Sequence, residues 1–276
     1  MTAPVYPLRD GNTIPAIGLG TYGLNEQVGV NEIVSAIGDG YRLIDTAYNY
    51  GNEDVVGEAV RRTDVDRSDL VITTKLPGRH HGFDETLASF EESRRRLDLD
   101  WVDLYLIHWP NPRIDKYIDT WRAMIRLREK GLVRSIGVSN FTTAMLDRLE
   151  RETSVVPVVN QVELHPYFPQ AELRAYHEEH DIRTESWSPL AKRSELLQED
   201  VITALAAEKG VTPAQIVLRW HVELEAVPIP KSADAARRRE NLDVFSFGLA
   251  PEEVEAITAL SRGRLWGADP DSHEEF

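Results

Sequence analysis

The sequence predicts an α/β fold, a (β/α)8 barrel of the TIM type formed by residues 1–276 as a single domain. Short apolar runs alternate with helical patterns along the whole chain, and a polar residue follows each apolar run. Most of the intervals between successive runs are about 25 to 30 residues long, the size of one βαβ unit. Eight such units in 276 residues favour a closed barrel.

The apolar runs are rich in valine, isoleucine and leucine, as strands buried on both faces should be. We expect strands at Ala16–Gly20, Arg42–Thr46, Leu70–Lys75, Val102–His108, Val133–Val138, Pro157–Gln161, Ile182–Trp187 and Ala226–Ile229. An N-terminal β-hairpin over Val5–Ile14, turning at Asp10 and Gly11, is expected to precede them.

Helical patterns with their own start signals fill the intervals. Asp84 is a candidate cap for a helix with Phe90 and Leu97 on its apolar face, and Thr212 with Gln215 forms a candidate capping box. The longer interval before the last strand predicts an additional helix. Further helices are expected at Asn31–Asp39, Glu53–Arg62, Asp115–Glu129, Thr143–Glu152, Gln170–Glu179, Glu199–Lys209 and, at the C-terminal end, Pro251–Leu260.

Composition excludes several classes of function. The chain has 31 basic and 46 acidic residues and a formal net charge of −15, so nucleic acid and anionic membranes are not expected as partners. It has no cysteine, which excludes disulfides, thiolate nucleophiles and iron–sulfur ligation. The first residues lack a signal-peptide pattern, and no apolar run reaches the roughly 18 residues of a membrane span. We therefore expect a cytoplasmic protein.

Polar and aromatic residues follow all eight expected strands. The carboxyl ends of barrel strands meet at one rim, where the chemistry of this fold gathers. The residues at this predicted rim are Tyr22, Asp45, Lys75, His108, Ser139, Asn140, Gln161, Trp187, Lys231 and Ser232.

Asp45, Tyr50, Lys75 and His108 supply the parts of a carbonyl-reducing site. A tyrosine can protonate the forming alkoxide, but its ordinary pKa of about 10 is high for an acid at neutral pH. A neighbouring ammonium lowers that pKa, a carboxylate holds the ammonium, and an imidazole orients the carbonyl oxygen. Each residue alone also fits a structural role, such as a turn cap for Asp45 or a core histidine for His108. The combination favours catalysis.

Three separated segments resemble the signatures of the aldo-keto reductase superfamily. They are Gly40–Ala47 followed by Tyr50–Glu53, then Ile136–Phe141, and then Ile229–Ser232 with Arg237, Glu240 and Asn241. The resemblance runs in register from about Val5 to Leu260. The tryptophan at position 187 and the compact length are similar to a bacterial branch that resembles 2,5-diketo-D-gluconate reductases.

The resemblance implies NADPH-dependent reduction of aldehydes, ketones or α-dicarbonyls. It implies Tyr50 as general acid, Lys75 and Asp45 as its tuning pair, and His108 as the substrate-orienting donor. It further implies a cofactor site in which Trp187 stacks on the nicotinamide. The other cofactor residues are Ser139, Asn140 and Gln161 on the carboxamide, Ser188 and Leu190 beside Trp187, and Glu240 and Asn241 at the adenine. Lys231, Ser232 and Arg237 belong to the clamp on the 2′-phosphate, in which Arg237 stacks on or bridges the adenine ribose.

Arg238 and Arg239 extend the positive cluster at Lys231 and Arg237, although a solvated helix face is the simpler interpretation of such a run. The walls of the substrate pocket are expected to include Tyr22, Trp109 and Trp266, and we hypothesise that the tail over residues 263–276 folds over the site. The family implies a monomer. No metal is expected, because His177 and His180 lack a third ligand at a sensible spacing.

Two other interpretations remain open. Gly18, Gly20 and Gly23 satisfy the dinucleotide-binding pattern G-x-G-x-x-G, which is typical of a two-domain Rossmann dehydrogenase. No helix is expected directly after Gly23, with helical pattern resuming only near Val30, and this weakens the match. The second interpretation is a non-catalytic member of the barrel family that binds NADPH as a sensor or structural subunit.

Overall fold

Eight parallel strands occupy the centre of the molecule in the computed structural model, which describes residues 3–276. Each strand pairs with the next one along the chain, so the order in the sheet follows the order in the sequence. All eight expected strands are confirmed. They are β3 (Leu19–Gly20), β4 (Leu43–Asp45), β5 (Val71–Leu76), β6 (Val102–Ile107), β7 (Val133–Ser139), β8 (Val159–Glu163), β9 (Arg183–Trp187) and β10 (Val227–Pro228).

Two backbone hydrogen bonds join the first strand to the last. The Gly18 N–H donates to the Pro228 carbonyl oxygen at 3.0 Å, and the Gly20 N–H donates to that of Pro230 at 3.1 Å. Gly18 permits this close approach, because a Cβ there would lie 2.6 Å from Cδ1 of Ile229. The sheet is therefore closed into the predicted barrel.

The closed, sequential sheet overturns the Rossmann alternative, since a doubly wound sheet requires a reversal of strand order. The helix after Gly23 begins at Glu26, earlier than the sequence suggested. The expected start of this helix near Val30 was therefore wrong and does not count against a dinucleotide-binding motif. The order of the strands is what excludes the Rossmann fold.

The predicted hairpin is confirmed at the amino end of the barrel. Its strands, β1 (Val5–Pro7) and β2 (Thr13–Pro15), pair antiparallel. Leu8 and Ile14 belong to the same buried cluster as barrel residues such as Leu104. The hairpin therefore closes this end of the barrel with apolar side chains, and only the carboxyl end stays open for a site.

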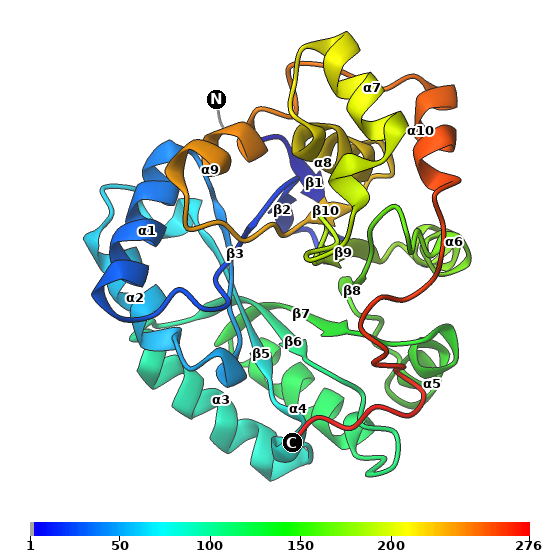
Figure 1. The fold of residues 1–276 in the computed structure, drawn as a ribbon. Helices are drawn as coiled ribbons and strands as arrows, with labels where there is room; N and C mark the ends of the chain where they lie inside the picture. Colours follow the sequence, from blue (N-terminus) through cyan, green and yellow to red (C-terminus); the bar gives the residue numbers. More distant parts are fainter. Residues whose placement is uncertain (1–2) are drawn as a thin grey trace.

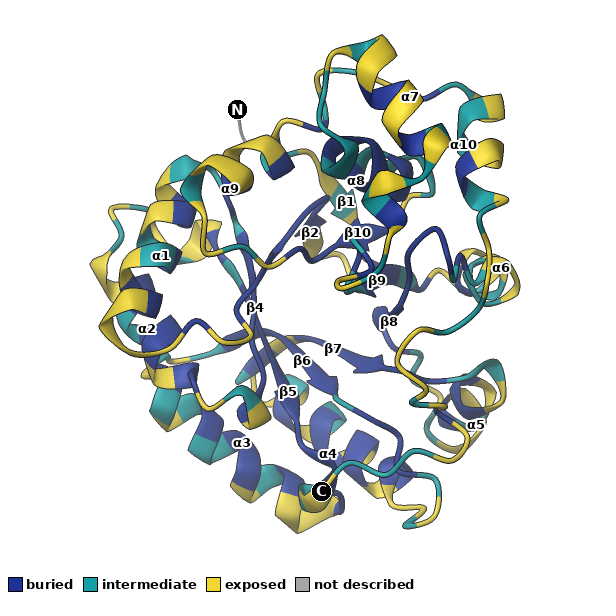
Figure 2. Cartoon of the chain, viewed as in Figure 1, coloured by how far each residue is buried: buried dark blue, intermediate teal, exposed yellow. Residues whose placement is uncertain are grey.

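Helices surround the barrel and bury one face each against it (Figures 1 and 2). Seven carry the connections between strands or the segment after the barrel: α1 (Glu26–Asp39), α2 (Glu53–Arg62), α3 (Phe83–Leu97), α4 (Tyr117–Glu129), α5 (Thr143–Thr153), α6 (Ala171–Glu179) and α10 (Pro251–Thr258). The long interval before β10 carries both α7 (Asp200–Lys209) and α8 (Pro213–Glu223), so the additional helix is confirmed.

The helix start signals gave mixed results. The capping box of α8 is confirmed, with Thr212 Oγ1 accepting from the Gln215 N–H and Gln215 Oε1 accepting from the Thr212 N–H. Asp84 as a cap is wrong, because α3 starts at Phe83 after Gly82 and Asp84 lies in its first turn. A further helix, α9 (Ala235–Leu242), was not expected from the sequence, and Asp234 caps its first turn.

Within residues 3–276, no single helix is long and apolar enough to span a membrane; only α7 and α8 taken together pass that test, and they meet at 95°. After α10, the red C-terminal segment runs back across the barrel past α6 and α5 (Figure 1).

Candidate active site

A buried ion pair lies at the carboxyl ends of β4 and β5. Lys75 Nζ donates to Asp45 Oδ1 at 2.5 Å and to the Thr46 carbonyl oxygen at 3.0 Å. The Lys75 side chain is wholly buried and that of Asp45 is 4% exposed. Burial alone would lower the pKa of Lys75, but the Asp45 carboxylate and, more weakly, Tyr50 oppose burial and leave the pKa above its usual value. Lys75 is therefore a fixed cation at neutral pH.

Tyr50 ends the short helix η1 (Tyr48–Tyr50), directly beside this pair. Lys75 Nζ lies 5.1 Å from the centre of the Tyr50 ring. Burial raises the pKa of Tyr50, and the Lys75 ammonium opposes that rise without cancelling it. Lys75 thus acts in the expected direction, but burial is the larger effect, so Tyr50 keeps its proton at neutral pH.

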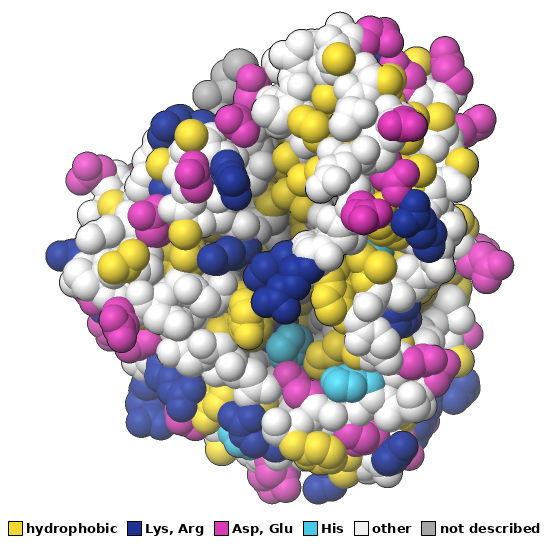
Figure 3. Space-filling view, in the orientation of Figure 1, with side chains coloured by type: hydrophobic (Ala, Val, Ile, Leu, Met, Phe, Trp, Pro, Cys, Tyr) yellow, Lys and Arg dark blue, Asp and Glu magenta, His cyan; other side chains and the backbone are white. Residues whose placement is uncertain are grey.

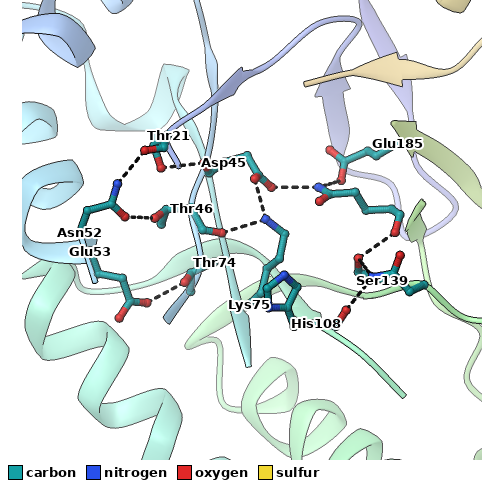
Figure 4. A network of polar contacts seen from close by, with 12 residues as sticks. Thr21, Asp45, Thr46, Asn52, Glu53, Thr74, Lys75, His108, Ser139 and Glu185 are labelled. Atoms are coloured by element: carbon teal, nitrogen blue, oxygen red, sulfur yellow. Dashed lines mark hydrogen bonds and ion pairs between the residues drawn. The ribbon is translucent and has the colours of Figure 1, made fainter. Parts of the chain in front are cut away.

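His108 follows β6, and its ring centre lies 6.0 Å from that of Tyr50. The structure therefore brings all four residues of the predicted tetrad to one place, as Figure 4 shows for Asp45, Lys75 and His108. Nδ1 of His108 lies 2.7 Å from Oε1 of Glu275, a residue of the C-terminal tail that the sequence analysis did not single out.

Gln161 joins Asp45 to Glu185 on β9 and so extends the polar network across the barrel; Figure 4 shows Asp45 and Glu185 on the two sides of this connection. Gln161 Nε2 donates to Asp45 Oδ2 at 2.9 Å and to Glu185 Oε2 at 3.0 Å. Burial, reinforced by the negative charge of Asp45, raises the pKa of Glu185 to about 8. Glu185 is therefore a neutral acid at pH 7, held in the barrel interior.

Ser139, Asn140 and Trp187 form a second chain of hydrogen bonds at the rim. The Ser139 hydroxyl donates to the Gln161 carbonyl oxygen at 2.7 Å, and Asn140 Nδ2 donates to Ser139 Oγ at 3.0 Å. Trp187 Nε1 donates to Asn140 Oδ1 at 2.8 Å. These hydrogen bonds fix the orientations of the three predicted cofactor residues relative to one another. Ser188 and Leu190, which come just after Trp187 in the sequence, are half-buried.

The structure divides the positive cluster that the sequence suggested. Arg238 is 1% exposed and forms an ion pair with Glu32, so its inclusion in an accessible cluster was wrong. Arg239 pairs with Asp39. Lys231 and Arg237 are exposed, and neither has an ion-pair partner in the described part of the chain. Ser232 is half-buried beside Lys231, Glu240 is exposed on α9, and Asn241 is buried.

Figure 3 shows lysine and arginine side chains beside a hollow at the barrel mouth, which hydrophobic and histidine side chains line. A positive edge around an apolar hollow suits a ligand that combines phosphates with a flat ring.

The three predicted pocket aromatics lie around this mouth. Tyr22 is 65% exposed and contacts the Tyr50 ring edge-on, with 5.2 Å between the ring centres. Trp266, on the tail, lies 5.5 Å from the ring of Trp187. Trp109 is buried under another tail residue, His273, at 4.3 Å. The tail therefore contributes to the walls of the site.

Two anchors hold the tail across the mouth. At one end, the Leu265 N–H donates to Glu163 Oε1 at 2.7 Å, and Arg264 pairs with the other oxygen of the same carboxylate. At the other end, Asn111 binds both the backbone N–H and the backbone carbonyl of Glu275.

Sequence reasoning missed Glu163, Asn111, Glu185 and Glu275. Asn111 lies between two prolines and Glu275 in an acidic stretch. In the sequence, the first context indicates only a turn and the second only a solvated tail, so neither indicates a functional residue.

Two buried histidines outside the tetrad, His177 and His221, have hydrogen-bond partners within the protein. His177 is buried between Asn160 and Thr184, and His221 contacts Ser186 Oγ and the Pro189 carbonyl oxygen. Burial lowers the pKa of each to about 3, so both are neutral. Among residues 3–276 there is no group of three or more residues that could hold a metal ion.

Comparison with known proteins agrees with this geometry. The model of the aldo/keto reductase family matches residues 16–262. The chain is 60% identical over 273 residues to 2,5-diketo-D-gluconic acid reductase B of a Corynebacterium species, with 99% of both chains covered. It is 45% identical over 268 residues to methylglyoxal reductase DkgA of Escherichia coli, with 97% of each covered.

The fold of this chain is similar over its whole length to a solved structure of a Gox0644 variant in complex with NADPH. The TM-score is 0.94 and the sequence identity 43%, and the match covers 99% of this chain and 100% of the other.

Proposed function

This chain belongs to the aldo/keto reductase family as an NADP(H)-dependent oxidoreductase, and on that premise we propose that it reduces small aldehydes, ketones or α-dicarbonyls to alcohols with Tyr50 as the general acid. The carrying observation is the position of Tyr50, which is half-buried at the barrel mouth beside the Lys75–Asp45 pair and the His108 ring. A carbonyl placed there meets a proton donor and a hydrogen-bond donor together.

Burial raises the pKa of Tyr50, so Tyr50 carries its proton before the reaction, and the Lys75 ammonium opposes this rise and thereby favours release of the proton. When the carbonyl carbon accepts a hydride, the oxygen takes the Tyr50 proton and leaves a phenolate. The Lys75 ammonium then stabilises that phenolate, and Asp45 keeps the ammonium in place. His108 orients the carbonyl oxygen through Nε2.

The rim residues fit a nicotinamide cofactor, which supplies the hydride when bound. Trp187 is half-buried and oriented by Asn140, so one face of its ring can stack on a flat ligand ring. Lys231 and Arg237 would hold the 2′-phosphate, since both are exposed and no acidic group in residues 3–276 pairs with them. Ser139 and Gln161 would hold the carboxamide.

The proposed substrates are small, with a flat or apolar portion, because Tyr22, Trp109 and Trp266 narrow the mouth. The names of two relatives, a diketogluconic acid reductase and a methylglyoxal reductase, support the α-dicarbonyl class. The tail forms a cover over the site. The protein works as a single-domain monomer in the cytoplasm, without nucleic-acid or membrane partners.

The test is NADPH oxidation with a panel of small aldehydes and α-dicarbonyls, comparing the wild type, Tyr50→Phe and Tyr48→Phe. Tyr48 lies in the same short helix, but its hydroxyl donates to Glu92 on α3 and serves as a matched control. Loss of the proton donor should reduce kcat/KM about a thousandfold in Tyr50→Phe. Tyr48→Phe should keep most of the activity.

Cofactor binding is measured separately by quenching of tryptophan fluorescence with NADPH. Full activity in Tyr50→Phe would refute the general acid. Binding without turnover across the whole panel would favour the non-catalytic sensor instead.

A further inference from the structure

The C-terminal tail places a carboxylate against the substrate-orienting histidine. Glu275 Oε1 lies 2.7 Å from His108 Nδ1, and the side chain of Glu275 is 13% exposed. The two residues are far apart in sequence and meet because the tail crosses the barrel mouth.

Two donors form hydrogen bonds with the same carboxylate. Asn49 Nδ2 donates to Oε1 at 2.8 Å, and the Gly78 N–H donates to Oε2 at 2.9 Å. Burial alone would raise the pKa of Glu275, but the contacts with His108, Gly78 and Asn49 outweigh burial and lower the pKa to about 2. The carboxylate is therefore an anion at neutral pH.

The backbone of Glu275 is also held in place. Its N–H donates to Asn111 Oδ1 at 3.0 Å, and Asn111 Nδ2 donates to its carbonyl oxygen at 2.8 Å. Asn111 is fully buried. A Cβ at position 78 would lie 2.3 Å from the Glu275 carbonyl oxygen, so the glycine makes room for the tail. The position of the carboxylate thus depends on several side chains of the barrel loops.

The other ring nitrogen of His108 has no hydrogen-bond partner among residues 3–276 and is free for a substrate. A carboxylate beside Nδ1 stabilises a proton on that nitrogen and restricts rotation of the ring. It also offsets the positive charge when Nε2 carries a proton as well.

We infer that Glu275 is a positioning residue for carbonyl reduction, which holds the His108 ring with a protonated Nδ1 against the tail and with Nε2–H directed at the carbonyl oxygen. The inference rests on the proposed function, because it needs a carbonyl in the site. His108 loses no proton in the reaction: Tyr50 protonates the oxygen, and the His108 hydrogen bond polarises the carbonyl.

Other titratable groups near the pair do not replace Glu275. Tyr50 faces His108 from η1 and is neutral at neutral pH. His81, after η3 (Gly78–His80), is buried, which lowers its pKa to about 4 and leaves it uncharged. Lys116, before α4, is a cation. Of the groups named here, Glu275 alone supplies a negative charge at Nδ1.

The kinetic test compares Glu275→Gln with Glu274→Gln and Glu275→Asp. Glu274 is the matched control, because it also lies on the tail but accepts from the Arg113 N–H. Loss of one charge-assisted contact should lower kcat of Glu275→Gln about tenfold while the KM for NADPH stays the same. Glu275→Asp should regain part of the loss, and Glu274→Gln should behave as wild type. Unchanged or increased kcat in Glu275→Gln would overturn the inference.

The second readout is the ¹⁵N spectrum of the histidine rings, which does not depend on turnover. The chain has eight histidines, and His108→Gln identifies the signals of His108. Nδ1 of His108 should be protonated in the wild type and in Glu274→Gln, and its signals should shift in Glu275→Gln. Gly78→Ala, which displaces the tail without changing the carboxylate, should cause the same shift.

The two readouts separate the inference from the proposed function. A wild type without turnover would refute the function, while the spectra would still test the contact. His108 signals that are identical in the wild type, Glu275→Gln and Gly78→Ala would overturn the inference even in an active enzyme.

Discussion

Two buried aspartates lie at opposite ends of the barrel and use their charges differently. Asp103, near the amino end of β6, is 5% exposed and pairs with Arg67 at 2.6 Å and with Arg134 at 3.2 Å. The Ile72 N–H and the Trp101 indole also donate to it. Both guanidiniums reach solvent, so this aspartate is fully partnered at a small desolvation cost.

Asp45, at the carboxyl end of β4, has one cationic partner, and that partner is wholly buried. Lys75 is shared with the neighbouring Tyr50 ring, so its charge is directed at a group that is proposed to react. The amino end of the barrel thus holds ion pairs that reach solvent and contribute to stability. The carboxyl end holds a costly buried pair beside the proposed general acid.

The largest expected effect comes from Lys75→Met. It removes the cation proposed to stabilise the Tyr50 phenolate, and kcat/KM should fall about a thousandfold. It also leaves Asp45 buried without a cation, which should reduce the free energy of unfolding by about 3–5 kcal/mol. Steady-state kinetics and urea unfolding measure the two effects.

The double variant Asp45→Asn/Lys75→Met separates stability from chemistry. Replacing both charges removes the uncompensated carboxylate, so much of the lost stability should return while activity stays low. If activity returned together with stability, the pair would be structural, like the one at Asp103.

The barrel could be predicted because its signal repeats eight times along the chain. Each strand is short and apolar, and the polar residue after it lies at the rim whatever the exact boundary, so errors at single ends did not matter. Asp45, Lys75 and His108 were found for the same reason, since each lies at the end of an expected strand, whereas Tyr50 was found from its chemistry and from the resemblance to the family signature.

Contacts made by irregular segments could not be predicted. Glu275 reaches His108 only because Asn111 and Gly78 bind the tail, and no periodicity connects these positions. Arg238 and Arg237 are adjacent in sequence, but α9 buries one and exposes the other. The tertiary environment therefore decided which charges are available to a ligand.

Glu185→Gln extends the comparison of Asp45 and Asp103 to a third buried acid, which has no cation bonded to it. Burial raises the pKa of Glu185 from 4.5 to about 8. Between these pH values the unfolded chain releases the proton while the folded protein keeps it, so stability falls as the pH rises through this window. Glutamine does not titrate, and the variant should be about 4 kcal/mol more stable than wild type at pH 8.

Urea unfolding at pH 5 and pH 8 measures this difference, with Glu172→Gln on the exposed surface of α6 as control. A pH dependence equal to that of the wild type would mean that Glu185 is charged in the folded protein.

Asp103→Asn tests the amino end of the barrel directly. Asparagine keeps one acceptor but loses the ion pairs to Arg67 and Arg134, which are partly exposed and screened by solvent. The free energy of unfolding should fall by about 1 kcal/mol. The kcat/KM should not change, because Asp103 lies at the opposite end of the barrel from Tyr50. A large loss of activity would contradict the division of labour between the two ends.

The smallest effect on stability is expected from Arg237→Ala, which extends the comparison of the buried charges to an exposed one. Arg237 has no ion-pair partner within residues 3–276, so its removal should leave the urea midpoint unchanged. A guanidinium on the 2′-phosphate contributes one charge-assisted contact, and the Kd for NADPH should rise about tenfold. The Kd for NADH, which lacks that phosphate, should stay the same. Arg239→Ala is the control, because Arg239 lies on the same helix, α9, but pairs with Asp39 at the end of α1. An equal loss for both cofactors would place Arg237 on the adenine or ribose, and the preference for NADPH would then depend on Lys231.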